Sequence, residues 1–273
     1  MSTSNSAAAS NGDDILLRSD DTNHGISTLT LNRPKQYDTL TTALLDELLL
    51  QLQDIRGDSS VRVVIIKSSN PKCFSSGHDL KELLMSTTQE KQELFKKCSS
   101  VMMYLTQHLP QPVIAQVHGV CTAAGTQLVA SCDLATCSHD SKFGVNGIDV
   151  GLFCTTPSVA LSRNMHRKHA MHMLLTGDFL SSEKALDYGL VNQVVSKEEL
   201  EDSTRAYAER IASKSPYAIQ LGKQAFYKQL ELHSLGDAYA FAGDVMCTNM
   251  DSHDAQEGIQ AFLEKRKPEW KGT

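Results

Sequence analysis

The chain contains the stretch PVIAQVHGVCTAAGTQLVASCD at residues 112–133. Its first seven residues form an apolar run, small residues follow at 119–125, and a short apolar helix is predicted around residues 127–130. A second strand-like segment begins at residue 132. A continuous apolar run bounded by turn residues is typical of a strand that is covered on both faces. The stretch therefore predicts a buried strand, a tight turn, a helix and a further strand.

The same alternation extends on both sides of this stretch. Strands are predicted at residues 26–31 (ISTLTL), 61–67 (VRVVIIK) and 190–195, and amphipathic helices at 40–55 and 89–106. Helices dominate from about residue 157, with the last ones at 196–213, 216–230, 236–250 and 252–265. Strands that alternate with helices predict an α/β fold with a parallel sheet. We expect a flexible N-terminal tail at 1–24, an α/β core at 25–200 and a helical C-terminal oligomerisation region at 201–273.

Composition limits the class of protein. The chain has 273 residues, of which 41% are hydrophobic and 21% are charged, and 26 basic against 32 acidic residues give a net charge of −6. This balance argues against a nucleic-acid-binding protein, which needs a clustered basic face. No apolar run reaches the roughly 18 residues of a membrane span. The N-terminal residues lack the apolar region of a secretory signal.

The cysteines and histidines predict neither a disulfide framework nor a metal site. The seven cysteines are an odd number and contain no CxxC pair: Cys73, Cys98, Cys121, Cys132, Cys137, Cys154 and Cys247. The ten histidines show no spacing typical of metal ligands. We therefore expect free thiols in a reducing compartment and no bound metal.

Several segments, in register over residues 25–268, carry a resemblance to a known family. They are FSSGHDLK at 74–81, PVIAQVHG at 112–119 with AAGTQLVASCD at 123–133, FG at 143–144 with DVGL at 149–152, LLTG at 174–177 and ALDYGLV at 185–191. LNRP at 31–34 and FLEKRKP at 262–268 add to them. Together they resemble the crotonase superfamily, also called the enoyl-CoA hydratase/isomerase family. FSSGHDLKEL and GLFCTTPSVAL are most similar to a mitochondrial subgroup of it.

The resemblance implies a spiral of ββα units, a helical C-terminal region, and trimers that often pair into hexamers. It also implies that two backbone N–H groups bind the thioester oxygen of an acyl-CoA and stabilise the enolate. By position, these donors are the N–H groups of His78 and Ala124. The family usually has Gly at the second position, so Ala124 requires a negative φ angle there.

Two catalytic residues of the hydratases are missing. The family's hydratases use two glutamates as general acid and base, and their positions correspond to Gln127 and Gly147 here. Glutamine cannot exchange a proton near pH 7, and glycine has no side chain. Since each such group typically contributes about 10²–10⁴-fold to the rate, hydratase activity should be weak or absent.

Other residues are candidates to replace the missing acids. Asp149 lies two residues beyond the lost glutamate, and we interpret it as structural. Cys154 is a candidate nucleophile near the acyl pocket, although buried thiols are usually inert. The side chain of His78 is a further candidate, and Asn146 could hold a water without activating it.

The resemblance also implies where the anionic coenzyme A would bind. Arg33 and Lys35 follow the first predicted strand, Lys81 follows the oxyanion loop, and Asp79 orders that loop or borders the nucleotide. Lys265, in the terminal helix, could reach the phosphate from a neighbouring subunit. The expected ligand-binding residues are Arg33, Lys35, Ser76, Gly77, Asp79, Lys81, Gly125 and Lys265.

Four functional hypotheses follow. The leading one is an acyl-CoA-binding protein of mitochondrial fatty-acid or lipid metabolism that has lost hydration chemistry and uses no cofactor besides the CoA thioester. The second is a lyase or isomerase with a surrogate acid. The third is an acyl-CoA decarboxylase that uses only the oxyanion hole, and the fourth is a structural role without a ligand.

Overall fold

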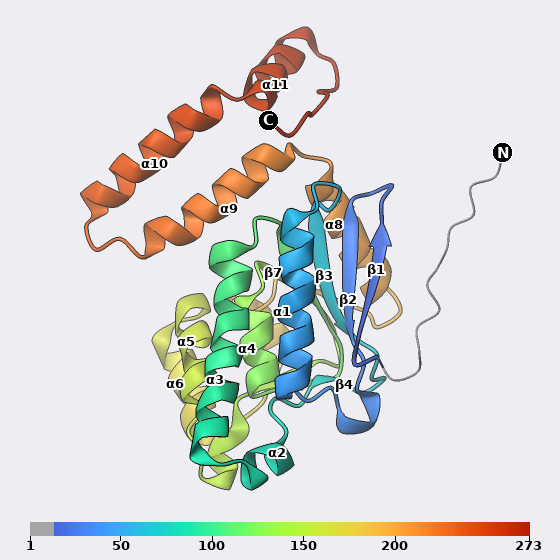
Figure 1. Ribbon diagram of the computed structural model, residues 1–273, viewed down its shortest axis with the longest axis vertical. Helices are drawn as coiled ribbons and strands as arrows, with labels where there is room; N and C mark the ends of the chain where they lie inside the picture. Colours follow the sequence, from blue (N-terminus) through green and yellow to red (C-terminus); the bar gives the residue numbers. More distant parts are fainter. Residues whose placement is uncertain (1–13) are drawn as a thin grey trace, which may run out of the picture.

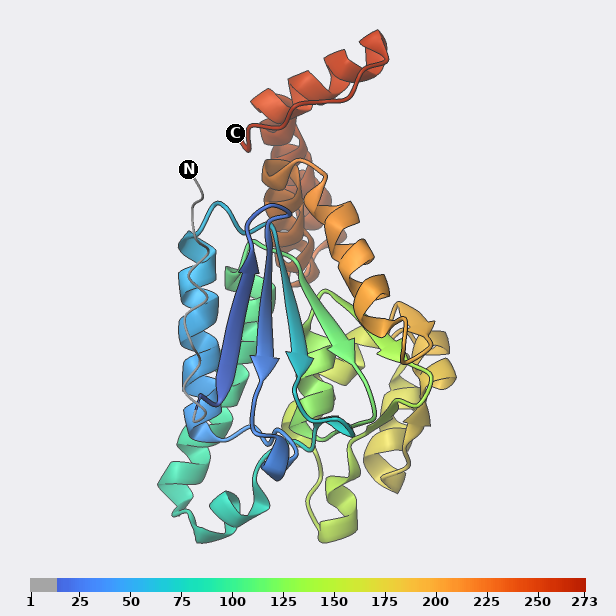
Figure 2. The ribbon, with the colours of Figure 1, turned by 90° about the vertical axis from the view of Figure 1, so that its right-hand side faces the viewer.

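The larger of two sheets forms the centre of the molecule. In the computed structural model, which describes residues 14–273, its strand order is β1-β2-β3-β5-β7-β10. β1 and β2 are antiparallel, and the other pairs are parallel (Figure 2). The strands are β1 (Leu16–Asp21), β2 (Ile26–Leu31), β3 (Val63–Ser68), β5 (Val113–Val117), β7 (Leu134–Ser138) and β10 (Gln193–Val195).

A smaller sheet continues from the ends of three of these strands. Its order is β4-β6-β8-β9, formed by β4 (Cys73–Ser75), β6 (Val120–Thr122), β8 (Lys142–Gly144) and β9 (Leu180–Ser181). Thus β3, β5 and β7 of the large sheet are each followed, after a short connection, by a three-residue strand of the small sheet and then by helical turns. This threefold repetition is the expected succession of ββα units, and the α/β fold class is confirmed.

The large sheet separates two apolar layers. Val64 and Ile66 of β3 point toward the main core, which is covered by α1, α3 and α4, whereas Val63 and Ile65 point toward α8 on the opposite face (Figures 1 and 2). This alternation follows from the two-residue period of a strand. The covering helices are α1 (Thr42–Gly57), α3 (Thr88–Met103) with a π-helical turn at Tyr104–His108, α4 (Ala124–Ser131) and α8 (Leu200–Ala212).

The remaining helices lie at the two ends of the molecule. Short α2 (Leu80–Met85) lies at one end, and α9, α10 and α11 form an arm that extends from the other (Figure 1). The other elements are α5 (Thr155–Asn164), α6 (Arg167–Thr176), α7 (Ser182–Asp187), α9 (Pro216–Leu230), α10 (Leu235–Met250), α11 (His253–Glu264) and the 3-10 turns Pro34–Gln36 and Asn146–Val150.

The expected domain boundaries need two corrections. The tail expected at 1–24 is too long, because Leu16–Asp21 form β1 and pair with β2; residues 1–13 lie outside the described part. The helical region expected from residue 201 starts later, because Ala208 and Ala212 of α8 pack on the large sheet. The α/β core therefore includes β1 and α8, and the separate helical arm begins with α9.

Within residues 14–273, no helix has the length and apolar character of a membrane span, and no three His, Cys, Asp or Glu side chains are grouped as metal ligands. All seven cysteines are free thiols, as expected.

A buried ion pair attaches the helical arm to the core. The Lys223 ammonium of α9 donates to Asp133 Oδ2 at 2.7 Å and to the Gln111 carbonyl at 2.8 Å, and Tyr227 donates to Asp133 Oδ1 at 2.9 Å. Asp133 Oδ2 also accepts from the Val113 amide at the start of β5. Burial lowers the pKa of Lys223. Asp133 thus links α9 to two neighbouring strands of the sheet.

We expect Asp133→Asn to lower the free energy of unfolding by about 3 kcal/mol, because it leaves the buried ammonium of Lys223 without its counter-ion. Chemical denaturation measures the change. The control is Glu201→Gln, which breaks the more exposed pair with Lys67 and should cost less than about 1 kcal/mol. Equal costs for the two variants would contradict a structural role for the Asp133 pair.

Candidate functional site

Two turns approach each other closely where the small sheet meets α4. Gly77, in the turn after β4, has a φ of +82°. A Cβ atom added to it would lie 2.7 Å from the Cβ of Ala123 and 3.0 Å from the amide nitrogen of Ala124, in the turn after β6. Only glycine fits at such a position, since real Cβ atoms do not approach this closely and L-residues with side chains avoid this φ.

A second glycine makes the approach reciprocal. A Cβ atom on Gly125 would lie 2.7 Å from the carbonyl oxygen of Ser75 and 2.8 Å from its Cβ. Each turn therefore has a glycine that faces the backbone of the other. The expectation that Gly77 and Gly125 belong to one site agrees with this geometry.

The approach brings two free amides together. Ala124 is the first residue of α4, so its N–H has no partner within the helix, and the helix dipole favours an anion there. Within residues 14–273, neither the Ala124 N–H nor the His78 N–H donates to a protein acceptor. Two donors without acceptors at one place are what an oxyanion hole requires.

The backbone strain falls on Ala123 and not on Ala124. Ala124 is helical, which satisfies the condition set by the sequence. Ala123, directly before it, has φ 52° and ψ −120°, a conformation that normally selects glycine.

The two expected acid positions differ in the space around them. Gln127 lies one turn after Ala124 on α4 and is 4% exposed; its Oε1 is enclosed without a donor. At Gly147, an added Cβ would lie 2.6 Å from the Leu152 carbonyl oxygen and 2.8 Å from the Cys154 Sγ. A carboxylate could replace Gln127 with little change in volume, whereas position 147 is closed to any side chain unless the backbone moves.

The substitutes for these acids have other roles or unsuitable chemistry. The Asp149 carboxylate lies against Gly177, where an added Cβ would be 2.8 Å from Oδ1. Burial raises the pKa of Cys154, which disfavours the reactive thiolate. Asp79 caps α2 by accepting from the Lys81 and Glu82 amides, and a contact of Asp79 with the nucleotide stays a prediction.

The His78 imidazole contacts the loop before α1 and a side chain of α3. Its Nδ1–H donates to the Leu40 carbonyl at 2.9 Å, and its ring packs edge-on against Phe95 of α3. Burial lowers the pKa of His78, so the ring is neutral at pH 7. Its Nε2 is enclosed without a partner in the described chain.

The loop that contains Arg33 and Lys35 packs on the turn after β4, which contains Gly77 and His78. The Ser76 amide donates to the Tyr37 carbonyl, and the Leu40 amide donates to the Gly77 carbonyl at 2.8 Å. Sequence analysis missed Asp38, a fully buried residue of this loop whose carboxylate accepts from the Arg33 and Asn70 amides and from the Ser68 hydroxyl. The two loops therefore form one unit.

The candidate basic residues differ in their contacts and in their distance from the site along the molecule. The Arg33 guanidinium donates to the Thr39 carbonyl and hydroxyl, whereas Lys35 and Lys81 are exposed near the site. Lys265 caps α11 in the arm, at the opposite end of the molecule from α2 (Figure 1). A contact of Lys265 with the ligand therefore stays a prediction that requires a second copy of the chain.

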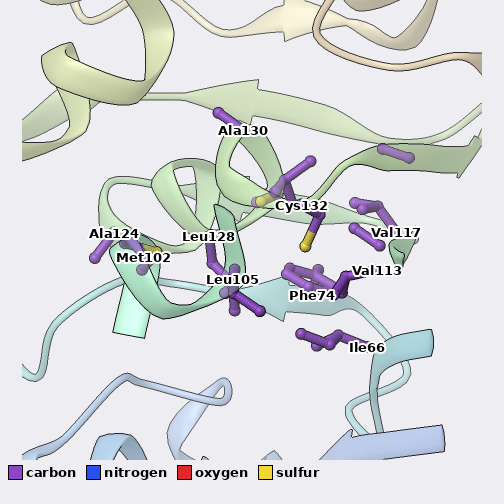
Figure 3. Close-up of a cluster of buried hydrophobic side chains, with 14 of the residues drawn as sticks. Ile66, Phe74, Met102, Leu105, Val113, Val117, Ala124, Leu128, Ala130 and Cys132 are labelled. Carbon is purple, nitrogen blue, oxygen red and sulfur yellow. The ribbon is translucent and has the colours of Figure 1, made fainter. Parts of the chain in front are cut away.

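A buried apolar cluster holds α4 in place behind the turn. Figure 3 shows Ala124 and Leu128 of α4 among Phe74 of β4 and Met102 and Leu105 from α3 and the turn that follows it. Because such cores are close-packed, the first turn of α4 cannot shift without disturbing its neighbours.

Comparison with known proteins agrees with this geometry. The sequence profile of the family described as enoyl-CoA hydratase/isomerase matches residues 21–273. The chain belongs to this family. A curated relative is the zebrafish enoyl-CoA hydratase domain-containing protein 3, mitochondrial, which is 46% identical over 263 residues, covering 96% of this chain and 90% of the relative.

Solved structures of family members share the fold. The human enoyl-CoA hydratase domain-containing protein 3 superposes with a TM-score of 0.88 at 44% identity, over 94% of this chain and all of that one. An enoyl-CoA hydratase of Mycobacterium smegmatis gives 0.91 at 47% identity, over 94% and 99% of the two chains. The resemblance to the family and to its mitochondrial subgroup, drawn from the motifs, is confirmed.

We expect Ala123→Gly to raise the free energy of unfolding by about 1 kcal/mol, because glycine adopts the positive φ without strain. The matched control is Ala130→Gly in the body of α4, where glycine should destabilise by about 1 kcal/mol or more. Chemical denaturation of both variants measures the two changes in the free energy of unfolding. A loss of stability in both would show that Ala123 is not strained.

Proposed function

We propose that this member of the family binds acyl-CoA thioesters and hydrates enoyl-CoA weakly or not at all. One observation carries the proposal: the Ala124 amide lies against the turn that contains Gly77 and His78, and neither the His78 amide nor the Ala124 amide has an acceptor in the described chain. By resemblance, Gln127 and Gly147 occupy the two positions of the hydratase acids. The polarising half of a hydratase site is present, and its proton-transferring half is absent.

The chemistry of hydration explains why both halves matter. The amides stabilise negative charge on the thioester oxygen, which lowers the barrier to any reaction that forms an enolate. Addition of water also needs a base for the water and an acid for the α-carbon, each worth about 10²–10⁴-fold. Of the candidate substitutes, Asp149 lies against Gly177, burial disfavours the Cys154 thiolate, and the His78 ring is bonded to the Leu40 carbonyl. A surrogate-acid hydratase therefore has less support than a binding protein.

Coenzyme A enters this proposal as part of the ligand, with no further cofactor. The loop with Arg33 and Lys35, the oxyanion loop with Ser76 and Lys81, and a neighbouring copy's Lys265 are the residues proposed to border it. The names of the relatives support a setting in mitochondrial acyl-CoA metabolism.

A trimer, or a hexamer of two trimers, is part of the same proposal. The arm exposes large apolar side chains that a lone chain would leave in water. They include Phe226, Leu230, Leu235, Tyr239, Phe262 and Leu263, which are 58–81% exposed. Association of the arms would cover this surface.

The proposal is tested by titrating the protein with butyryl-CoA in a calorimeter and by following the hydration of crotonyl-CoA. We expect saturable binding of butyryl-CoA and a hydration rate at least about 10²-fold below that of a two-glutamate hydratase. Absence of binding at millimolar ligand, or a rate within tenfold of that hydratase, would contradict the proposal.

Two variants test the two acid positions one at a time. Gln127→Glu should raise the hydration rate, because burial without donors would raise the pKa of the new carboxyl toward the range of a general acid. Gly147→Glu should give no gain and should lower stability, since its Cβ meets the Leu152 backbone. Gln193→Glu on the edge strand β10 is the control for the added charge and should leave the rate unchanged.

A further inference from the structure

The peptide group between Gly77 and His78 carries one of the two free amides and is bonded at its other end. Its carbonyl, that of Gly77, accepts from the Leu40 amide at 2.8 Å. Because this peptide is trans, its C=O and N–H point in opposite directions, so the His78 N–H points away from the loop that contains Leu40. The direction of this donor therefore depends on the bond between Leu40 and Gly77.

The residue that permits the close approach of the two turns also makes this peptide easy to rotate. Gly77 has a φ of +82° and no space for a side chain. Glycine populates positive and negative φ about equally, so Gly77 itself does not prevent a rotation that would redirect the His78 N–H. The Gly77 amide supplies one restraint, since it donates to the Ser75 hydroxyl at 3.2 Å. A peptide beside a glycine needs further restraints if its N–H is to keep one direction.

The side chain of His78 supplies such a restraint. Its Nδ1 lies 2.9 Å from the Leu40 carbonyl oxygen. A carbonyl oxygen can only accept, so Nδ1 carries the proton and donates. Leu40 thus donates to the carbonyl of the peptide and accepts from the side chain that follows that peptide. The imidazole bond fixes the Cα of His78 relative to Leu40, and this keeps the Gly77 carbonyl within reach of the Leu40 amide.

Both ends of the imidazole bond are fixed by the fold. The Leu40 side chain is fully buried in the main core, and the next residue, Thr41, caps α1 by accepting from the Leu44 amide. The imidazole is partly buried and packs edge-on against Phe95 of α3, with the ring centroids 5.4 Å apart. The bond therefore connects the turn after β4 to the start of one core helix and the face of another.

An acid–base role fits the imidazole less well than a restraining one. Burial lowers the pKa of His78, and its Nε2 is enclosed. Its Nδ1 is used in the bond to the Leu40 carbonyl. Neither ring nitrogen is therefore open to a ligand, whereas the backbone amide of the same residue has no acceptor in the described chain. The imidazole can act on a ligand only through the main chain.

We propose that the His78 imidazole is a positioning residue, which binds the Leu40 carbonyl and so keeps the N–H of its own peptide directed at the thioester oxygen. The inference rests on the proposed function, because it requires the thioester carbonyl to bind the amides of His78 and Ala124. Hydrogen bonds in a chain polarise one another, so the bond from Leu40 to the Gly77 carbonyl also strengthens the His78 N–H as a donor.

The test compares the binding of butyryl-CoA and S-butyl-CoA by calorimetry. S-butyl-CoA is a thioether of the same chain length that lacks only the carbonyl oxygen. The ratio of the two affinities therefore measures what the carbonyl contributes, whereas a general loss of structure would lower both affinities together. We expect the wild-type protein to bind butyryl-CoA about tenfold more tightly than S-butyl-CoA.

Substitutions separate the donor of His78 from its ring. His78→Asn keeps a donor at the same number of bonds from Cβ as Nδ1 but loses the ring, whereas His78→Phe keeps a ring and loses the donor. We expect His78→Asn to keep the affinity ratio within about twofold and His78→Phe to reduce it to about threefold or less. His78→Leu, which is smaller and also lacks a donor, replaces His78→Phe if the larger ring prevents folding.

The matched control is His169→Phe, the same substitution at another partly buried ring. His169 lies on α6, and its ring stacks on Tyr188 with centroids 3.5 Å apart. We expect this variant to keep the wild-type affinity ratio, because its ring makes no contact with the turn after β4.

The outcomes separate this inference from the proposed function. If the variants without a donor at position 78 keep the wild-type ratio, or if His78→Asn loses it as fully as His78→Phe, the inference is wrong while acyl-CoA binding stands. If the wild-type protein binds both ligands equally, the thioester carbonyl gains nothing at the two amides, and the inference fails with the proposed oxyanion site. If neither ligand binds, the proposed function fails and the inference fails with it.

Discussion

The close approach of two backbone turns determines what this site can do. Gly77 and Gly125 each face the other turn at a distance that leaves no room for a Cβ atom. This interlock brings the amides of His78 and Ala124 to one place without using either residue's side chain. Since these N–H groups belong to the backbone, the fold sets their position whatever side chains occupy positions 127 and 147.

The rest of the molecule holds these turns in place. The apolar cluster around Phe74 and Leu128 fixes β4 against α4 (Figure 3). The buried Asp38 carboxylate ties its own loop to the end of β3, and backbone hydrogen bonds from Leu40 to Gly77 and from Ser76 to Tyr37 join that loop to the turn after β4. At Gly147 the Leu152 carbonyl and the Cys154 thiol leave no room for a Cβ atom. The two positions therefore differ: a buried carboxamide fills position 127, whereas position 147 has no space for a side chain.

Long, strongly patterned elements could be predicted from the sequence. The strand expected at 26–31 is β2, and the helix expected at 40–55 corresponds to α1 at Thr42–Gly57. The motifs also placed Gly77, His78, Ala124 and Gly125 in one site. The small sheet could not be predicted, because strands of two or three residues are too short to show alternation. β1 was missed because LLRSDD pairs apolar residues with charged ones that gain partners only from the folded chain, such as Arg18 with Asp54.

Other features depend on three-dimensional contacts that no local pattern reports. The space at Gly147 is set by Leu152 and Cys154, and the orientation of Asn146 is set by Thr122 from another strand. The packing of α8 on the sheet follows from Ala208 and Ala212, whose small side chains permit a close approach. Sequence motifs thus located the candidate site, while the lack of space at position 147 became visible only in the fold.

The central claim, that two amides hold the thioester carbonyl, is tested most directly by infrared difference spectroscopy of butyryl-CoA labelled with ¹³C at that carbonyl. Two simultaneous hydrogen bonds weaken the C=O bond, so the labelled band should move to lower wavenumber when the ligand binds. A bound ligand whose carbonyl band stays at its position in water would contradict the account.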